Sequence, residues 1–199
     1  MKTRELVLLF TMIFVILFSL KSFSQFEQKF TFQASGGLVK PFGDVGDEFS
    51  SGLSLDAGAQ YNYNRSLAFV GLIKFVTLYP QEENQNYELK SIGIGICPKY
   101  RLLVDKKINP FIFGGLGLYF TKYSEFDSNT DEWIDSNFPT KLGYTFGAGV
   151  DVSITDHIAL FLQSGYNSTK LKDEDYNVVF NSLYFQVGIN ISFLKSKSL

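Results

Sequence analysis

The most constraining feature of the sequence is strict alternation of apolar residues with small or polar ones over long segments. Over residues 142–154 every second residue, from Leu142 to Ile154, is apolar, and the residues between them are small or polar. Residues 183–193 and 92–102 repeat the pattern. A period of two places one kind of side chain on each face of a β-strand. The pattern therefore predicts strands that meet a different solvent on each face.

Less regular versions of the pattern bring the number of predicted strands to eight, and no helix is expected beside them. The further segments are residues 30–39, 53–63, 67–79, 108–123 and 158–166. Most have ten residues or more, whereas strands of soluble domains usually have about 5 to 6 and a tilted membrane-spanning strand needs about 9 to 11. Every backbone group must be hydrogen-bonded in lipid, so the strands are expected to close on themselves. The predicted fold is all-β, an eight-stranded antiparallel up-and-down transmembrane β-barrel.

The connections between the predicted strands alternate in length. Those at residues 64–65, 103–107 and 155–156 are short. Long loops at one end and tight turns at the other are typical of outer-membrane barrels, whose long loops face outward. We call these the loop end and the turn end. The long, polar and acidic connections are residues 40–50, 80–88, 124–140 and 167–179.

Aromatic residues are expected to form two belts, one at each membrane interface, because amphipathic rings favour the headgroup region. Toward the loop end they are Tyr79, Tyr87, Tyr119, Tyr123, Tyr144, Tyr166 and Tyr184. Toward the turn end they are Phe30, Tyr61, Tyr63, Phe69, Tyr100 and Phe193.

Residues 1–24 have the three parts of a secretory signal peptide. Lys2 and Arg4 precede an apolar run over residues 6–20, and Ser22 and Ser24 place small residues before a predicted cleavage site at Gln25. An uncleaved membrane anchor is the alternative, but the run is short against the roughly 20 residues that a spanning helix needs. The predicted mature domain is residues 25–199, located in the outer membrane.

The signal peptide, the eight alternating segments, the alternation of loops and turns and the closing run 183–193 resemble a known family. They are similar to the small outer-membrane β-barrel proteins of the OmpA/OmpX-like and PorT-like kind, and the resemblance covers residues 25–193. It implies outer-membrane lipid and the barrel-assembly machinery as partners. Such proteins commonly end at an aromatic residue that this machinery reads, whereas here Phe193 is followed by residues 194–199.

Composition and motifs exclude several function classes. A formal net charge of −2 provides no basic field for nucleic acid. The only cysteine, Cys97, excludes an internal disulfide and a multi-cysteine metal site. The only histidine, His157, sits in a predicted tight turn with no nucleophile motif near it. We therefore expect no catalytic residues, no cofactor and no metal site.

Charged residues on the inward positions are expected to fill the lumen, because an eight-stranded interior has room for little else than side chains. Asp56 is expected to pair with Lys74, and Asp151 with either Arg101 or Lys99. A bulge is expected at Pro98, because a closed barrel has no edge strand to hold a proline. The inward charges are Asp56, Lys74, Lys99, Arg101 and Asp151.

Two functions are compatible with these features. The first is a non-enzymatic envelope protein with a structural or surface-interaction role, whose acidic extracellular loops contact a surface ligand or another envelope protein. The alternative is a small transporter or secretion-accessory barrel with a narrow lumen. Trp133, the only tryptophan, is either a belt anchor or a contact residue in the longest loop.

Overall fold

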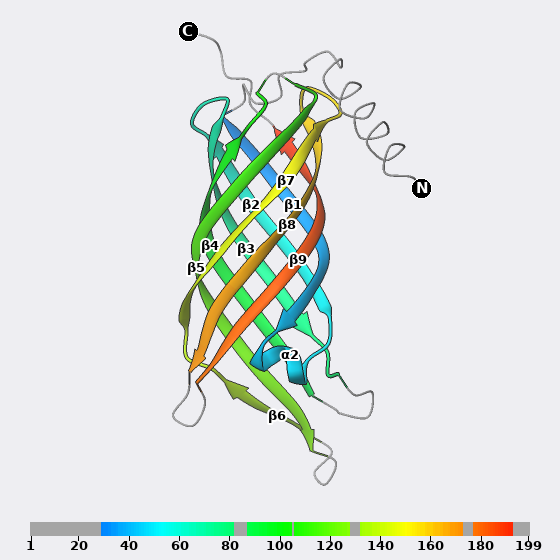
Figure 1. Ribbon diagram of the computed structural model, residues 1–199, viewed down its shortest axis with the longest axis vertical. Coiled ribbons are helices and arrows are strands. Elements are labelled where there is room, and N and C mark those ends of the chain that lie inside the picture. The colour runs from blue at the N-terminus through cyan, green and yellow to red at the C-terminus, as the bar shows by residue number, and fades with distance from the viewer. Residues whose placement is uncertain (1–28, 82–86, 105, 128–131, 173–176, 193–199) are drawn as a thin grey trace, which may run out of the picture.

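The computed structural model describes residues 29–81, 87–104, 106–127, 132–172 and 177–192 (Figure 1). The predicted signal peptide, Phe193 and the tail after it lie outside the described residues. Over the ranges given, no helix is long and apolar enough to cross a membrane.

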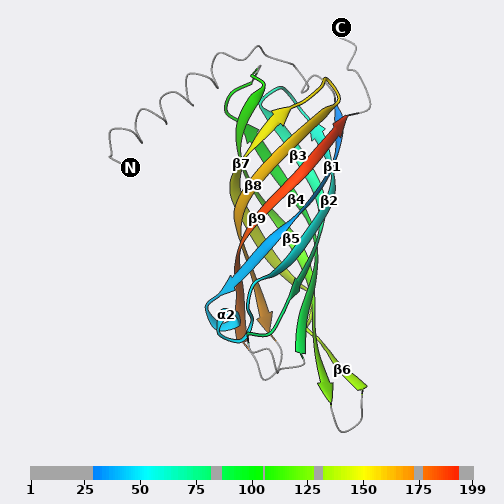
Figure 2. The ribbon, with the colours of Figure 1, turned by 90° about the vertical axis from the view of Figure 1, so that its right-hand side faces the viewer.

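Eight of the nine strands in this part of the chain form a closed antiparallel barrel. Each pairs with its neighbour in the sequence, and β1 pairs with β9 to complete the circle (Figures 1 and 2). This is the up-and-down topology that the sequence predicted. The elements are β1 (Phe30–Phe42), α2 (Asp44–Glu48), β2 (Gly52–Asn62), β3 (Leu67–Leu78), β4 (Tyr87–Arg101), β5 (Ile108–Asp127), β6 (Glu132–Asn137), β7 (Lys141–Ser153), β8 (Ile158–Lys172) and β9 (Asn177–Ser192).

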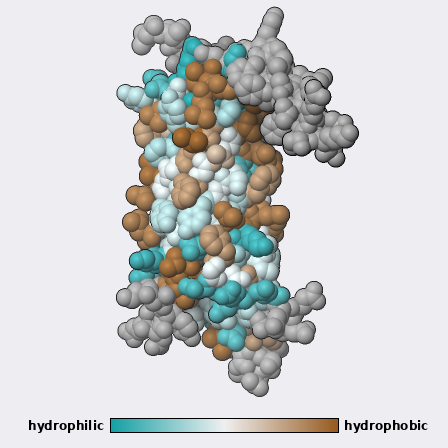
Figure 3. Space-filling view, in the orientation of Figure 1, coloured by the Kyte–Doolittle hydropathy of each residue, from teal (hydrophilic) through white to brown (hydrophobic). Residues whose placement is uncertain are grey.

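The two faces of each strand differ as the alternation predicted. On β7, Leu142 and Phe146 are exposed, whereas Thr145 is buried in the lumen. Figure 3 shows apolar side chains spread over the barrel wall in brown, with hydrophilic ones toward both ends. So many large apolar side chains on the outer face would be unfavourable in water, but they match the hydrocarbon of a bilayer.

The ladders at the loop end are longer than predicted. The expected loop 124–140 contains the end of β5 and all of β6, which form a hairpin that projects past the barrel (Figure 2). Most of the expected loop 167–179 is strand, since β8 and β9 stay paired up to Lys172 and Asn177. Above the bilayer a hydrogen-bonded ladder needs no apolar face, so the alternation that reveals a strand fades there.

A short helix corrects the expectation that the chain contains none. α2 has only five residues and follows Gly43, whose φ of 69° turns the chain back toward the barrel mouth. A positive φ is unfavourable for residues with a side chain, so glycine suits this position. So short a helix has too few residues to show a helical period in the sequence.

No bulge is present at Pro98. The β4–β5 register is the same before and after it, from Ile96 opposite Leu116 to Lys99 opposite Phe113, and only the pairs between these are missing. The gap falls opposite Gly114 and Gly115, and a Cβ at Gly115 would lie 2.4 Å from the Cys97 sulfur. The missing proline N–H is thus accommodated by a local break in the ladder rather than by an extra residue.

The predicted aromatic belts are corrected at the loop end. Tyr119 and Tyr184 are on inward positions and are buried in the lumen, while Tyr87 and Tyr123 pack against an apolar cluster inside the mouth. The rings that contact one another on the outer wall there are Phe42, Tyr144, Phe146 and Tyr166. At the turn end, the predicted residues within the described part of the chain do face outward, namely Phe30, Tyr61, Tyr63, Phe69 and Tyr100.

Candidate functional site

The turn half of the lumen is crossed by an ion pair between β4 and β7. The Lys99 Nζ atom lies 2.9 Å from each carboxylate oxygen of Asp151, whose residue is fully buried. β5 lies between the two strands, and its Phe111 ring has its centroid 3.7 Å from the Lys99 Nζ atom. The predicted pair of Lys99 and Asp151 therefore forms, and the Phe111 ring of the intervening strand packs against the ammonium group of Lys99.

Arg101 extends this network to the end of the barrel. Its Nε atom lies 3.7 Å from the carboxylate of Asp151, and its Nη2 donates a 2.9 Å hydrogen bond to the Asn62 side-chain oxygen. Nη1 donates to the backbone carbonyl of Arg65 in the β2–β3 turn, and Asn190 of β9 donates to Asp151. Side chains of β2, β4, β7 and β9 thus close the turn end. The Asn62 side-chain oxygen and the Arg65 carbonyl oxygen, which are neutral groups, accept hydrogen bonds from Arg101, the second cation of the network.

Asp56 and Lys74 form a second ion pair near the middle of the lumen. They lie directly opposite each other on β2 and β3, with Nζ and Oδ2 3.1 Å apart. The ammonium group also lies 3.9 Å from the centroid of the Tyr184 ring. A cavity of about 30 Å³ beside this pair has room for one or two water molecules. It is lined by Asp56, Lys74, Lys99, Thr145, Gln163 and Tyr184, among others.

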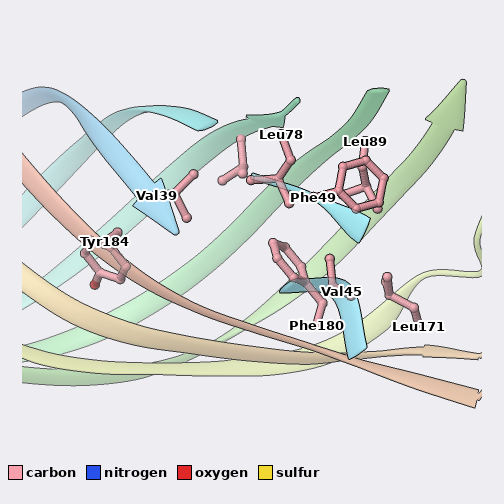
Figure 4. Packing of buried hydrophobic residues seen from close by; sticks show 9 residues of the cluster. Val39, Val45, Phe49, Leu78, Leu89, Leu171, Phe180 and Tyr184 are labelled. Carbon is pink, nitrogen blue, oxygen red and sulfur yellow. The ribbon is translucent and has the colours of Figure 1, made fainter. Parts of the chain in front are cut away.

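An apolar cluster fills the loop half of the lumen, and the sequence analysis did not predict it (Figure 4). α2 brings Val45 into the mouth, and Phe49, directly after the helix, forms a β-bridge with Pro80. The signal for it was present, because inward positions near the loop end of the strands are apolar rather than polar. We call this cluster the plug. It consists of Val39, Val45, Phe49, Val76, Leu78, Leu89, Leu171, Phe180 and Tyr184.

The β5–β6 hairpin carries Trp133 beyond a layer of charged residues. At the base of the hairpin the Asp135 carboxylate accepts hydrogen bonds from Lys122 and Ser124, which hold its pKa below the ordinary aspartate range. The Trp133 ring packs against Phe126 with centroids 5.5 Å apart and is half exposed, as is Ile134. The hairpin thus carries Trp133 past the Lys122–Asp135 ion pair at its base.

His157 and Cys97, the remaining side chains that could be reactive, lie on different elements of the barrel. His157 is in the β7–β8 turn, with its Nδ1 atom 3.1 Å from the Ser192 carbonyl oxygen. Cys97 is buried on the inner face of β4. In the ranges that the structure describes, no three His, Cys, Asp or Glu side chains are grouped to hold a metal ion.

The family described as outer membrane protein beta-barrel domain matches residues 10–193 of this chain. The chain belongs to this family. It is therefore an outer-membrane β-barrel. None of the curated proteins matches the sequence.

Solved structures with the same fold come from several bacteria. Neisserial surface protein A is 20% identical, with a TM-score of 0.62 over 83% of this chain and 97% of that one. OprG of Pseudomonas aeruginosa is 14% identical, with a TM-score of 0.51 over 85% and 98%. Ail of Yersinia pestis, solved with the heparin analogue sucrose octasulfate, is 15% identical, with a TM-score of 0.51 over 82% and 96%. At these identities the likeness concerns the fold alone.

Proposed function

We propose that this family member is a non-enzymatic barrel that acts through contacts of its loop end, with a lumen that does not serve as a passage. The observation that carries the proposal is the filling of the lumen. The Lys99–Asp151 and Asp56–Lys74 pairs occupy its turn half and middle, and the plug occupies its mouth. A barrel with a filled lumen can contact partners at its ends, but it does not offer a passage for solutes along its axis.

The proposal includes an orientation. Residues 1–24 act as a signal peptide, residues 25–199 form the barrel domain, and the barrel-assembly machinery inserts it with the loop end outside. Outer-membrane barrels have long extracellular loops and short periplasmic turns, and the two ends of this barrel differ in the same way. Protease added to intact cells should therefore cut within residues 124–140 and spare residues 103–107.

The charge of the loop end limits which partner it can bind. Glu132 directly precedes the exposed Trp133 on the hairpin, and Glu125 lies opposite Ile134. The remaining long connections are rich in Asp and Glu. The solved Ail complex holds a sulfated ligand, whereas an acidic loop end would repel such a polyanion. We infer a partner with basic or uncharged polar groups, from the cell surface or from another envelope protein, which contacts Trp133.

Site-specific photo-crosslinking in intact cells tests the surface contact. A crosslinking residue replaces Trp133 on the hairpin or, as the matched control, Tyr144 on the barrel wall, since both side chains are about half exposed. We expect protein adducts at position 133 and lipid adducts at position 144. A hairpin that captures no protein at position 133 in intact cells would contradict the proposal.

Planar-bilayer recording separates the proposal from the narrow transporter that the sequence left as an alternative. The purified barrel should show no stable conductance steps, because the plug and the ion pairs occupy the lumen. Regular single-channel steps from the unmodified protein would instead favour the transporter.

A further inference from the structure

Four basic residues gather on one side of the turn end. Lys29 immediately precedes β1, Arg65 lies in the β2–β3 turn, and Lys106 and Lys107 lie in the β4–β5 turn. Because β1 to β5 are consecutive neighbours in the barrel, these residues follow one continuous stretch of its rim. We call them the basic arc.

The backbone of the arc is held in place by the barrel. The Lys29 carbonyl accepts a 2.8 Å hydrogen bond from the Asn62 N–H, and the Lys107 carbonyl accepts one of 2.9 Å from the Ser153 N–H. The Arg65 carbonyl accepts from the buried Arg101 guanidinium. Lys29 and Arg65 are exposed, and Lys106 and Lys107 are partly exposed. The rim thus presents cationic side chains from a fixed backbone.

An aromatic layer lies along the same sector of the wall. Phe30 and Tyr61 pack together with ring centroids 5.3 Å apart. Tyr63, directly after β2, and Tyr100 on β4 are exposed as well. Across the barrel the exposed apolar residues that flank the β7–β8 turn are Ile154 and Ile158. Aromatic rings mark the level of the lipid headgroups, so the basic arc lies where headgroup phosphates are found.

We propose that the basic arc binds the phosphate groups of anionic phospholipids. The arc is continuous with the lipid-facing wall, and its charge is complementary to phosphate. At the loop end, the exposed lysines Lys90 and Lys122 form ion pairs with Glu88 and Asp135. The basic arc therefore places anionic lipid on one side of the turn end. The assignment of this bound lipid to the periplasmic leaflet rests on the proposed orientation, whereas the phosphate binding does not.

The test measures which lipids the full mature barrel retains. The protein is reconstituted in nanodiscs of phosphatidylcholine containing a minor fraction of phosphatidylglycerol, and retained lipids are counted by native mass spectrometry. Each lysine near a membrane surface contributes a factor of roughly five in affinity. Replacement of the three lysines, in Lys29→Gln/Lys106→Gln/Lys107→Gln, should therefore lower the preference for phosphatidylglycerol by about tenfold or more. High salt should lower the wild-type preference as well.

The control removes the same charge at the other end, in Lys40→Gln/Lys141→Gln/Lys170→Gln, and should leave the preference unchanged. An equal loss in both variants, or no preference in the wild type, would overturn the proposal. Displacement of the lipid by millimolar inorganic phosphate would also overturn it, because the arc would then be a site for free anions. A protease cut within residues 103–107 of intact cells would overturn the orientation and the choice of leaflet, but not the phosphate binding.

Discussion

The two halves of the lumen are closed by opposite chemistries. In the turn half, Asp151 and Lys99 are buried as ions and their charges are compensated by each other and by amide groups. In the loop half, Phe180 and Leu78 are buried to 1% and 0% exposure in an apolar cluster. Tyr184 belongs to both, since its ring lies in the plug and under the Lys74 ammonium group.

The difference follows from the solvent that each region would otherwise meet. The plug lies at a mouth that opens to water, so burying apolar side chains there gains the hydrophobic free energy. Deeper in the barrel the outer face of each strand is in hydrocarbon. Polar side chains on the other face then determine which face of the strand turns toward the lumen. A slip of one residue would place Asp56 or Asp151 in lipid, so buried charges there specify the register.

The largest effect is expected from removing the anion of the turn half. Asp151→Ala leaves Lys99 and Arg101 buried without their counter-ion and should lower the free energy of unfolding by about 3 to 5 kcal/mol. Denaturant unfolding in detergent micelles measures the loss. The Lys99→Ala/Asp151→Ala double variant should recover part of it. The same double-mutant cycle with Arg101→Ala and Asp151→Ala should give a smaller coupling energy, because the Arg101 Nε atom is 3.7 Å from the Asp151 carboxylate. Additive losses in both cycles would show that these groups do not interact.

A smaller loss is expected from the plug. Phe180→Ala leaves a cavity without leaving a charge behind, and it should lower the free energy of unfolding by about 3 kcal/mol. Hydrogen exchange should increase in α2 and at the mouth while β4 and β7 stay protected. The loss should not change with salt, unlike that of the charged half. Uniform deprotection of the barrel would mean that the plug does not form a separate layer.

Tyr184 tests the boundary between the halves. Tyr184→Phe keeps the ring under Lys74 but removes the hydroxyl, which lies 3.1 Å from the Thr145 hydroxyl. The free energy of unfolding should fall by about 1 kcal/mol. Tyr144→Phe, on the exposed outer wall, is the matched control and should change it by much less. Equal losses at both positions would mean that the Tyr184–Thr145 hydrogen bond adds nothing to stability.

The smallest effect is a local response to pH outside the lumen. The hydrogen bonds from Lys122 and Ser124 lower the pKa of Asp135, so their stabilisation of the hairpin is complete above the ordinary aspartate range. It is lost as the pH falls through the lowered pKa. Quenching of the single tryptophan, Trp133, should rise in that acidic range without unfolding of the barrel. In Asp135→Asn this step should be absent, and a step that persisted there would assign it to another group.

The sequence by itself determined the inside and the outside of this protein. Alternation over residues such as 142–154 sets which side chains meet lipid, and the same parity places Asp56, Lys74, Lys99, Arg101 and Asp151 in the lumen. Parity is decisive because successive residues of a strand face opposite sides. Parity also placed Tyr119 and Tyr184 inward, against the belt prediction, which had relied on residue type.

Only the tertiary structure decided which partners meet inside. The choice of Lys99 over Arg101 as the close partner of Asp151 depends on the offset of β4 and β7 across β5, and that offset is set when the barrel closes. The plug depends on α2 folding back after Gly43, and the β5–β6 hairpin on ladders that continue in water. Contacts between strands that are not neighbours leave no periodic trace in a chain, because they arise from closure and not from local pattern.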